Sequence, residues 1–409
     1  MSRATTFLAA ALVLVGCAAA RPAAPTPLQR EITGLVEQMA RIHPDVGHQV
    51  PLAELRARAA DLAERAPGLS RDELVVGLMR LTALGDRDGH GGIFLFDPAH
   101  TRPFHFYELR LHDFADGMHV VADATGRGLT GKRVTSIDGV PVAEVSERVR
   151  PLIPHDNAST IRLLLPEYLI CAEVLRGLGI ADGPVTYAFA DGSSATLADA
   201  VPGPSYALGT AYQPLPAPRS QLLYRGLNQP FLLAPLERGR SLYLGYHQVT
   251  TPPQALLDRI LRQAKRPGFR RLVVDVRQNG GGNNTTYSPL LDLFRMPPLS
   301  RRGKVVVLIG RMTFSAAGNF AADADQETRA LFVGEPTGGA PNQWGDRGPI
   351  PLPRAGLTAY VALEYVEVNP RDTRLAVMPD VRVEPTAADF LSGRDPVLQR
   401  ALRHAPAHP

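Results

Sequence analysis

A serine and a glycine-rich turn in the second half of the chain are the residues best placed to do chemistry. Ser315 lies in TFSAAGN, directly after an apolar run of strand length (304–310) and at the start of a helical pattern. A hydroxyl there projects from a rigid element, and the unpaired amides of the first helical turn face any oxyanion that it creates. Gly280, Gly281 and Gly282 could bring further amides close, because no side chain obstructs their approach. Together these features fit an acyl-transfer site; the plainer alternatives are a helix N-cap and an ordinary turn.

The general base for such a site must come from elsewhere in the chain. Only three lysines occur, Lys132, Lys265 and Lys304, so no lysine follows the serine and a downstream Ser-Lys pair is excluded. Among the eleven histidines, His90 lies in LGDRDGHGG, a polar glycine-rich turn after a helical segment. A loop of this kind can present a base, so His90 is the predicted one. No HExxH motif or paired cysteine spacing occurs, and we expect neither a metal nor another cofactor.

Alternating strand and helix patterns surround the serine and predict an α/β fold. Continuous apolar runs at 270–276, 304–310 and 330–339 alternate with helical stretches around 286–295 and 315–326. Two successive crossovers of this kind place their strands in parallel. The polar and glycine-rich turns then lie at the carboxyl ends of the strands, where open α/β sheets bind their ligands.

The first part of the chain has different patterns. Residues 29–84 carry apolar side chains at three- and four-residue spacing, which predicts helices, with Ser70 as an N-cap. Between 104 and 150 the period changes towards two, and Asp-Gly pairs at 116–117 and 138–139 predict two hairpins. A helical unit followed by a small β unit is therefore expected.

Length and composition favour a globular protein of two or three domains. The chain has 409 residues, of which 44% are hydrophobic and 21% charged. Lys and Arg number 44 against 40 acidic residues, so the net charge of +4 does not favour nucleic-acid binding. No stretch is long and apolar enough to predict a transmembrane helix.

The beginning of the chain has the pattern of an export signal. Arg3 precedes an apolar run at 7–16, and LVGC ends in Cys17, as in a bacterial lipoprotein box. We expect Cys17 to be lipidated and the protein to be anchored on the periplasmic or cell-surface side of a membrane; the alternative is ordinary cleavage within 18–20. Residues 18–28 then form a Pro/Ala-rich tether. The other cysteine, Cys171, is expected to be a buried thiol.

Four motifs occur in one order and together resemble the tail-specific, or carboxyl-terminal processing, serine peptidase family. They are DVRQNGGGNN, VVVLIGRMTFSAAGNFA, VGEPTGGAPN and MPDVRVEPTAADFLSGRDPVLQRAL. The match is strong over 235–403 and weaker over 85–150, where GKRVTSIDGVPVAEV resembles a degenerate PDZ domain. The resemblance implies a crotonase-like catalytic core, a nucleophile at Ser315, and an oxyanion hole formed by the amide of Ala316 and one from the Gly280–Gly281 turn.

The sequence is closer to the tricorn-core branch of this family than to the Ser-Lys branch. In the tricorn-core pattern a histidine before the PDZ-like element is the base, and His90 matches that position. The preceding residue, a tetrad serine in that pattern, is Gly89 here. The carboxylate that supports the base is expected just before the Pro-Asp motif, where Asp372 is favoured and Glu367 is the alternative.

We therefore predict an exported serine endopeptidase that hydrolyses peptides or proteins through an acyl-enzyme on Ser315. A catalytically silent module that binds peptides or lipids on the same fold is the alternative. The predicted organisation is a signal peptide (1–17), a tether (18–28), a helical unit (29–100), a PDZ-like β element with a connecting region (101–232) and the protease domain (233–403).

Overall fold

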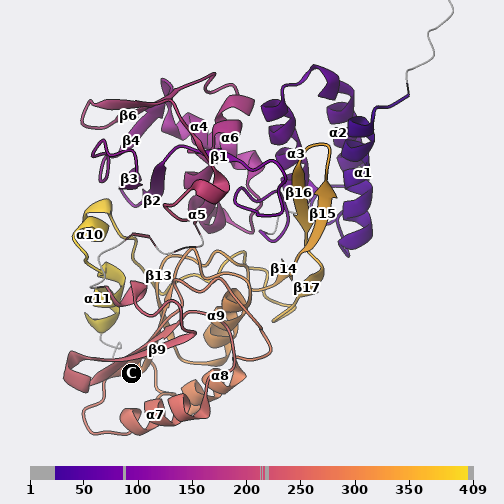
Figure 1. Ribbon diagram of the computed structural model, residues 1–409. Coiled ribbons are helices and arrows are strands. Elements are labelled where there is room, and N and C mark those ends of the chain that lie inside the picture. The colour runs from indigo at the N-terminus through magenta and orange to yellow at the C-terminus, as the bar shows by residue number, and fades with distance from the viewer. Residues whose placement is uncertain (1–23, 86–88, 212, 214, 217–220, 404–409) are drawn as a thin grey trace, which may run out of the picture.

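The computed structural model arranges the chain as an N-terminal half, with helices and small sheets, above a six-stranded sheet covered by helices (Figure 1). The described residues are 24–85, 89–211, 213, 215–216 and 221–403. The predicted signal segment and Cys17 lie outside them.

Three helices begin the described chain, as the helical periodicity predicted: α1 (Pro27–Ile42), α2 (Leu52–Arg65) and α3 (Arg71–Gly85). The amide of Glu73 donates to Ser70 Oγ at 3.2 Å, and the amide of Ser70 donates to Glu73 Oε2 at 2.8 Å. This reciprocal pair is a capping box, which satisfies two amides at the start of α3. The predicted N-cap role of Ser70 is therefore confirmed.

A hairpin from late in the sequence packs against these N-terminal helices. It consists of β15 (Gly348–Leu352) and β16 (Leu357–Val361), which lie beside α1 (Figure 1). Alternate side chains of both strands share one hydrophobic core with α1. The predicted domain division places this hairpin in 233–403, so the two halves of the chain are interlocked. The two-stranded sheet of β14 (Gln343–Gly345) and β17 (Glu364–Val366) connects the hairpin to the rest of that region.

Short sheets and helices follow α3. Both predicted hairpins are present: β2 pairs with β3 around 116–117, and β4 pairs with β5 around 138–139. The elements of this region are β1 (His105–Phe106), β2 (Leu109–Phe114), β3 (Gly117–Asp123), β4 (Val134–Ile137), β5 (Val140–Pro141), α4 (Val142–Val149), α5 (Ala158–Tyr168), α6 (Ala172–Gly177), β6 (Val185–Phe189), β7 (Ser194–Leu197) and β8 (Val201–Pro202).

The six-stranded sheet has the order β18-β13-β12-β11-β10-β9, in which only β9 runs antiparallel to its neighbour. The parallel arrangement predicted for the three central apolar runs is confirmed. The strands are β9 (Phe231–Leu236), β10 (Ser241–Tyr246), β11 (Arg271–Asp275), β12 (Val305–Ile309), β13 (Leu331–Gly334) and β18 (Val381–Arg382).

Helices cover both faces of this sheet. Successive side chains of a strand point to opposite faces: Val307 packs with α7 (Gln254–Ala264), α8 (Ser288–Arg295) and α9 (Ala316–Glu327). Val306 and Leu308 pack on the other face with α11 (Pro396–Arg403), which follows α10 (Ala387–Leu391). The sheet is therefore a rigid platform for the turns at its carboxyl edge.

A cavity of about 120 Å³ lies between that carboxyl edge and the N-terminal half. Residues of β2 and α5 line one side, and the turns that follow β11, β12 and β13 line the other. Glu167 of α5 borders the cavity, and its carboxylate accepts a hydrogen bond from the amide of Ala211. Burial raises the pKa of Glu167 to about 7, against the smaller opposing effects of that hydrogen bond and of Arg110.

The raised pKa of Glu167 makes stability depend on pH. Between about pH 4.5 and pH 7 the folded chain retains a proton that the unfolded chain has lost. The free energy of unfolding therefore falls as pH rises through this window, by roughly 3 kcal/mol from this residue. We expect Glu167→Gln to remove that fall, as measured by urea unfolding at pH 5 and pH 8. The same change at exposed Glu64 is the control, and an unaltered pH dependence in Glu167→Gln would contradict the prediction.

Candidate active site

Ser315 occupies a strained turn between β12 and α9. It is the N-cap of α9 with φ 52° and ψ −132°, a conformation that costs free energy for a residue with a Cβ. Hydrogen bonds on both sides stabilise it: the amide of Phe314 donates to the carbonyl of Asn279 at 3.2 Å, and Gln343 Nε2 donates to the carbonyl of Ser315 at 3.0 Å. Such a turn presents a hydroxyl at the end of a buried strand, as nucleophile-bearing turns do.

His90 lies against this hydroxyl although 225 residues separate the two in sequence. Its Nε2 is 3.1 Å from Ser315 Oγ, within hydrogen-bond distance for proton transfer. The imidazole also stacks on Phe314, with ring centroids 4.6 Å apart and planes 26° apart. The residue that precedes the serine therefore helps to fix the position of the ring.

Gly89 gives the imidazole the space for this stacking. Its φ is +75°, and a Cβ at this position would lie 2.9 Å from Phe314 Cζ. A serine at position 89 would therefore force Phe314 away from its contact with His90. Glycine at position 89 therefore allows the aromatic ring of Phe314 to support the imidazole of His90.

The glycine turn after β11 lies directly beside Ser315. Gly281 has a φ of +120°, and a Cβ there would lie 2.8 Å from Ser315 Cβ and 3.3 Å from the amide nitrogen of Ala316. Only glycine permits this approach. However, the amide of Gly281 donates to Asn279 Oδ1 at 3.0 Å, so it stabilises the turn from within.

This hydrogen bond corrects the assignment of Gly281 as an oxyanion donor. Two of the predicted donors remain. Ala316 is the first residue of α9, where amides have no partner within the helix. Gly280 is exposed at the turn beside it. The amides of Ala316 and Gly280 are therefore the candidates for stabilising negative charge.

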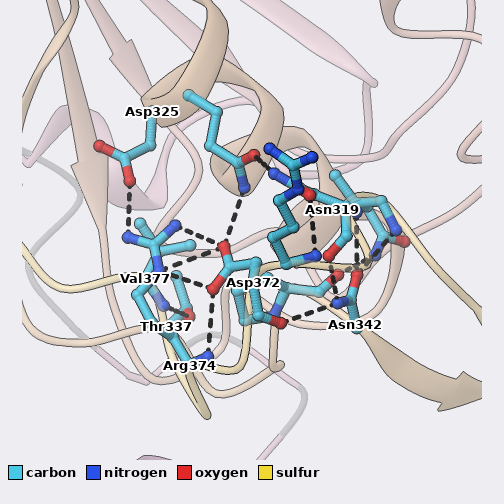
Figure 2. Close-up of polar contacts among 12 residues, drawn as sticks. Asn319, Asp325, Thr337, Asn342, Asp372, Arg374 and Val377 are labelled. Atoms are coloured by element: carbon cyan, nitrogen blue, oxygen red, sulfur yellow. Dashed lines mark hydrogen bonds and ion pairs between the residues drawn. The ribbon is translucent and has the colours of Figure 1, made fainter.

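Asp372 does not lie at the base. Its carboxylate accepts hydrogen bonds from Arg374, at 2.7 Å and 2.9 Å, and from Gln326 at 2.8 Å (Figure 2). Hydrogen bonding from Arg374 is also the main reason that the pKa of Asp372 is lowered. Gln326 is ten residues beyond Ala316 on α9, roughly 15 Å along the helix axis. The expectation that Asp372 orients His90 is thus corrected, and the alternative, Glu367, is exposed.

An acid that the sequence analysis missed lies beside Gly89, the residue before His90. Asp156 Oδ2 is 3.6 Å from the position that a Cβ on Gly89 would take. This oxygen and Nδ1 of His90, the ring nitrogen that faces away from the serine, are both buried. Asp156 directly precedes Asn157, whose side-chain oxygen caps α5.

Asn157 fixes Asp156 relative to the turns beside Ser315. Its Nδ2 donates to the carbonyls of Thr337 and Gly338 at 3.1 Å and 3.0 Å. Gly339, next in this turn, packs so closely that a Cβ there would lie 3.1 Å from the amide nitrogen of Ser315. The segment HDNAST resembles no known motif and reads only as a helix start, so no signal in one sequence distinguishes Asp156.

The other chemical candidates lie elsewhere. Lys132 Nζ binds the Asp191 carboxylate and Lys304 Nζ donates to a backbone carbonyl, while Lys265 caps α7. Cys171 is buried, as predicted, and burial raises the pKa of its thiol.

Within the described ranges, no group of histidine, cysteine and acidic side chains could bind a metal ion. None of the helices in the described part of the chain has the length and apolarity to cross a bilayer.

Comparisons with solved structures identify the fold. No protein-family model matches the sequence, and a search of curated proteins finds no match. Mature CPAF in complex with lactacystin is similar over 89% of this chain and 96% of its own, with a TM-score of 0.60 and 14% identity. A CPAF mutant structure is similar over 93% of this chain and 98% of its own, with a TM-score of 0.63 and 13% identity.

The chain has the fold of CPAF. The photosystem II D1 C-terminal processing protease is also similar over 91% of this chain and 98% of its own, at 16% identity and a TM-score of 0.38. The CPAF likeness extends over both halves of the molecule.

Proposed function

We propose that the protein is a serine-type endopeptidase whose nucleophile is Ser315 and whose general base is His90. The observation that carries the proposal is the 3.1 Å contact between His90 Nε2 and Ser315 Oγ, at the mouth of a helix and beside a glycine turn. The likeness to CPAF supports the fold that brings these residues together.

The reaction follows from this arrangement. His90 accepts the proton of Ser315 as the oxygen attacks a peptide carbonyl, and the amides of Ala316 and Gly280 stabilise the oxyanion. His90 then donates that proton to the leaving amine, which leaves an acyl-enzyme for water to hydrolyse. Asp156 is the acid that we assign to orient His90 and stabilise its charged form, in place of Asp372.

The finer classification is part of the same proposal. We assign the six-stranded sheet and its helices to a crotonase-like core, the sheet of β4 to β7 to a PDZ-like element, and the chain to the tricorn-core branch. The pattern before residue 18 supports export and lipidation at Cys17, which would anchor the enzyme on the periplasmic or cell-surface side of a membrane. Peptides or proteins in that compartment would be its substrates.

A fluorophosphonate probe tests the proposal, because it modifies only an activated serine. We expect the wild-type protein to be labelled, Ser315→Ala to be unlabelled, and Ser392→Ala, which changes an exposed serine, to be labelled at the wild-type rate. Mass spectrometry of the labelled peptide would locate the adduct. Labelling that persists in Ser315→Ala would refute the assignment of the nucleophile.

A silent binding module on the same fold is the second candidate. The observation that favours it is the commitment of Asp372 to Arg374, which leaves the expected acid away from the base. A folded wild-type protein that no fluorophosphonate labels, and that cleaves no member of a peptide library, would favour the binding module over the enzyme.

A further inference from the structure

The cavity between the two halves of the molecule begins at the candidate oxyanion turn. Its wall includes Gln278, two residues before Gly280, and Met312, three residues before Ser315. Met312 Cε lies 3.7 Å from the position that a Cβ on Gly280 would take. The cavity therefore shares a wall with the turns that would bind a scissile carbonyl.

The rest of the wall is mainly apolar. Leu111 and Phe114 of β2 and Leu163 and Ile170 from α5 and its C-terminal end line the side that faces the sheet, and Leu223 lines another side. The two turns would bind the carbonyl oxygen of the substrate residue that is cleaved. The side chain of that residue is attached to its Cα atom, which is bonded directly to the carbonyl carbon. This side chain is the part of a substrate closest to the cavity.

The arginines that border the cavity have their charges compensated or their donors occupied. Arg110 donates to the backbone carbonyls of Leu208 and Thr210 at 3.0 Å and 2.8 Å. Arg277 pairs with Asp275 and Asp395, Arg311 pairs with Glu335 at 2.6 Å, and Arg394 pairs with Asp389 at 3.0 Å. An occupant would therefore find no arginine available for an acidic side chain.

The titratable groups on the wall also favour a neutral occupant. Burial, followed by the nearby Arg311 and Arg110, lowers the pKa of His112 well below its ordinary value, so its imidazole is neutral. Glu167 is protonated below about pH 7. A neutral imidazole and a protonated carboxyl group each donate and accept hydrogen bonds, which suits an apolar side chain with or without a hydroxyl.

We propose that this cavity binds the side chain of the substrate residue that supplies the scissile carbonyl, and that the preferred side chain is uncharged and of leucine to phenylalanine size. The volume of about 120 Å³ is of the same order as the roughly 150 Å³ of an apolar protein cavity that accommodates benzene, so phenylalanine, whose ring is benzene-sized, is the upper limit. The inference rests on the proposed peptidase function and adds its substrate class.

A peptide series that differs only at this residue tests the assignment in the full-length protein. We expect kcat/KM for the leucine and phenylalanine peptides to exceed that for the alanine peptide by about tenfold or more, because small differences in the filling of an apolar pocket change rates by such factors. Lysine and aspartate peptides should be cleaved more slowly than the alanine peptide.

Two tryptophan variants of adjacent residues sharpen the test. Leu223→Trp places a large side chain in the cavity, whereas Leu222, its neighbour in the same short turn, packs against the sheet core and serves as the control. We expect Leu223→Trp to lower kcat/KM about tenfold or more for the leucine and phenylalanine peptides and less than threefold for the alanine peptide. The Leu222→Trp ratios should equal those of the wild type.

Fluorophosphonate labelling separates the possible failures. An altered peptide preference in Leu223→Trp, together with wild-type labelling and wild-type preference in Leu222→Trp, supports the assignment. Three results with normal labelling would overturn the cavity assignment alone. They are equal rates for all side chains, a preference for charged side chains, and the same preference in Leu223→Trp as in the wild type. A folded wild-type protein that is neither labelled nor active overturns the proposed function and this inference together.

Discussion

Ser315→Ala and His90→Ala are each expected to reduce peptide hydrolysis by about 10⁴-fold or more, and the double variant is expected to lose no more than either single variant. The reason is that the two side chains, 3.1 Å apart, act in one proton transfer, so removal of either one stops that step. The measurement is kcat/KM with a fluorogenic peptide for all four proteins, together with circular dichroism to verify their folding.

His105→Ala is the control for the histidine. Its Nδ1 lies 2.7 Å from Glu173 Oε1 at the start of β1, and it does not line the cavity, so its loss should change kcat/KM far less than the loss of His90. Losses in the two single variants that multiply in the double variant would show that Ser315 and His90 act independently. Near-normal hydrolysis by His90→Ala would assign the base to another residue.

The positions of Ser315 and His90 could be predicted because each depends on a local pattern. A continuous apolar run followed by a small-residue helix predicts a serine at the carboxyl edge of a sheet, and the three central strands are parallel as expected. A histidine in a glycine-rich turn after a helix is presented by a loop. Both predictions depend on helices and strands that their own sequence periodicity indicates, so they do not require knowledge of contacts between distant segments.

The supporting acid could not be predicted, because its identity depends on competition between partners distant in sequence. Arg374 lies two residues after Asp372 and binds its carboxylate, and Gln326 completes that site at the far end of α9. Asp156 has no distinctive neighbours in sequence. It is brought near His90 because Asn157 binds the carbonyls of the 337–338 turn, a contact across 180 residues.

Gly281 shows a second limit of reasoning from sequence. A glycine in a turn predicts that another segment can approach its backbone closely. A Cβ on Gly281 would lie only 2.8 Å from Ser315 Cβ, which confirms that this position requires glycine. Whether its amide faces the reacting group or the interior of its own turn depends on Asn279, whose side chain accepts that amide hydrogen bond. A glycine in the sequence indicates that its backbone amide can approach the serine closely. It does not indicate which acceptor that amide donates its hydrogen bond to.

Arg277→Met is expected to lower the free energy of unfolding by about 3–5 kcal/mol, because it leaves two buried carboxylates without their cation. Arg277 begins the glycine turn and donates to Asp275 at 2.6 Å and to Asp395 at 2.8 Å. Burial alone would lower the pKa of Arg277, but Asp275 and Asp395 outweigh it and raise that pKa well above its ordinary value. Urea unfolding of the variant measures the loss.

A triple variant separates loss of charge compensation from loss of packing. In Arg277→Met combined with Asp275→Asn and Asp395→Asn, no buried ion remains in this network, whereas the bulk of the side chains is nearly conserved. We expect it to recover most of the lost free energy of unfolding, because the penalty of an unpaired buried charge disappears with the charge. A triple variant as unstable as Arg277→Met alone would show that the guanidinium stabilises the turn through its hydrogen-bond geometry. In that case the rate of fluorophosphonate labelling at Ser315 should fall in both variants, since the same turn carries Gly280.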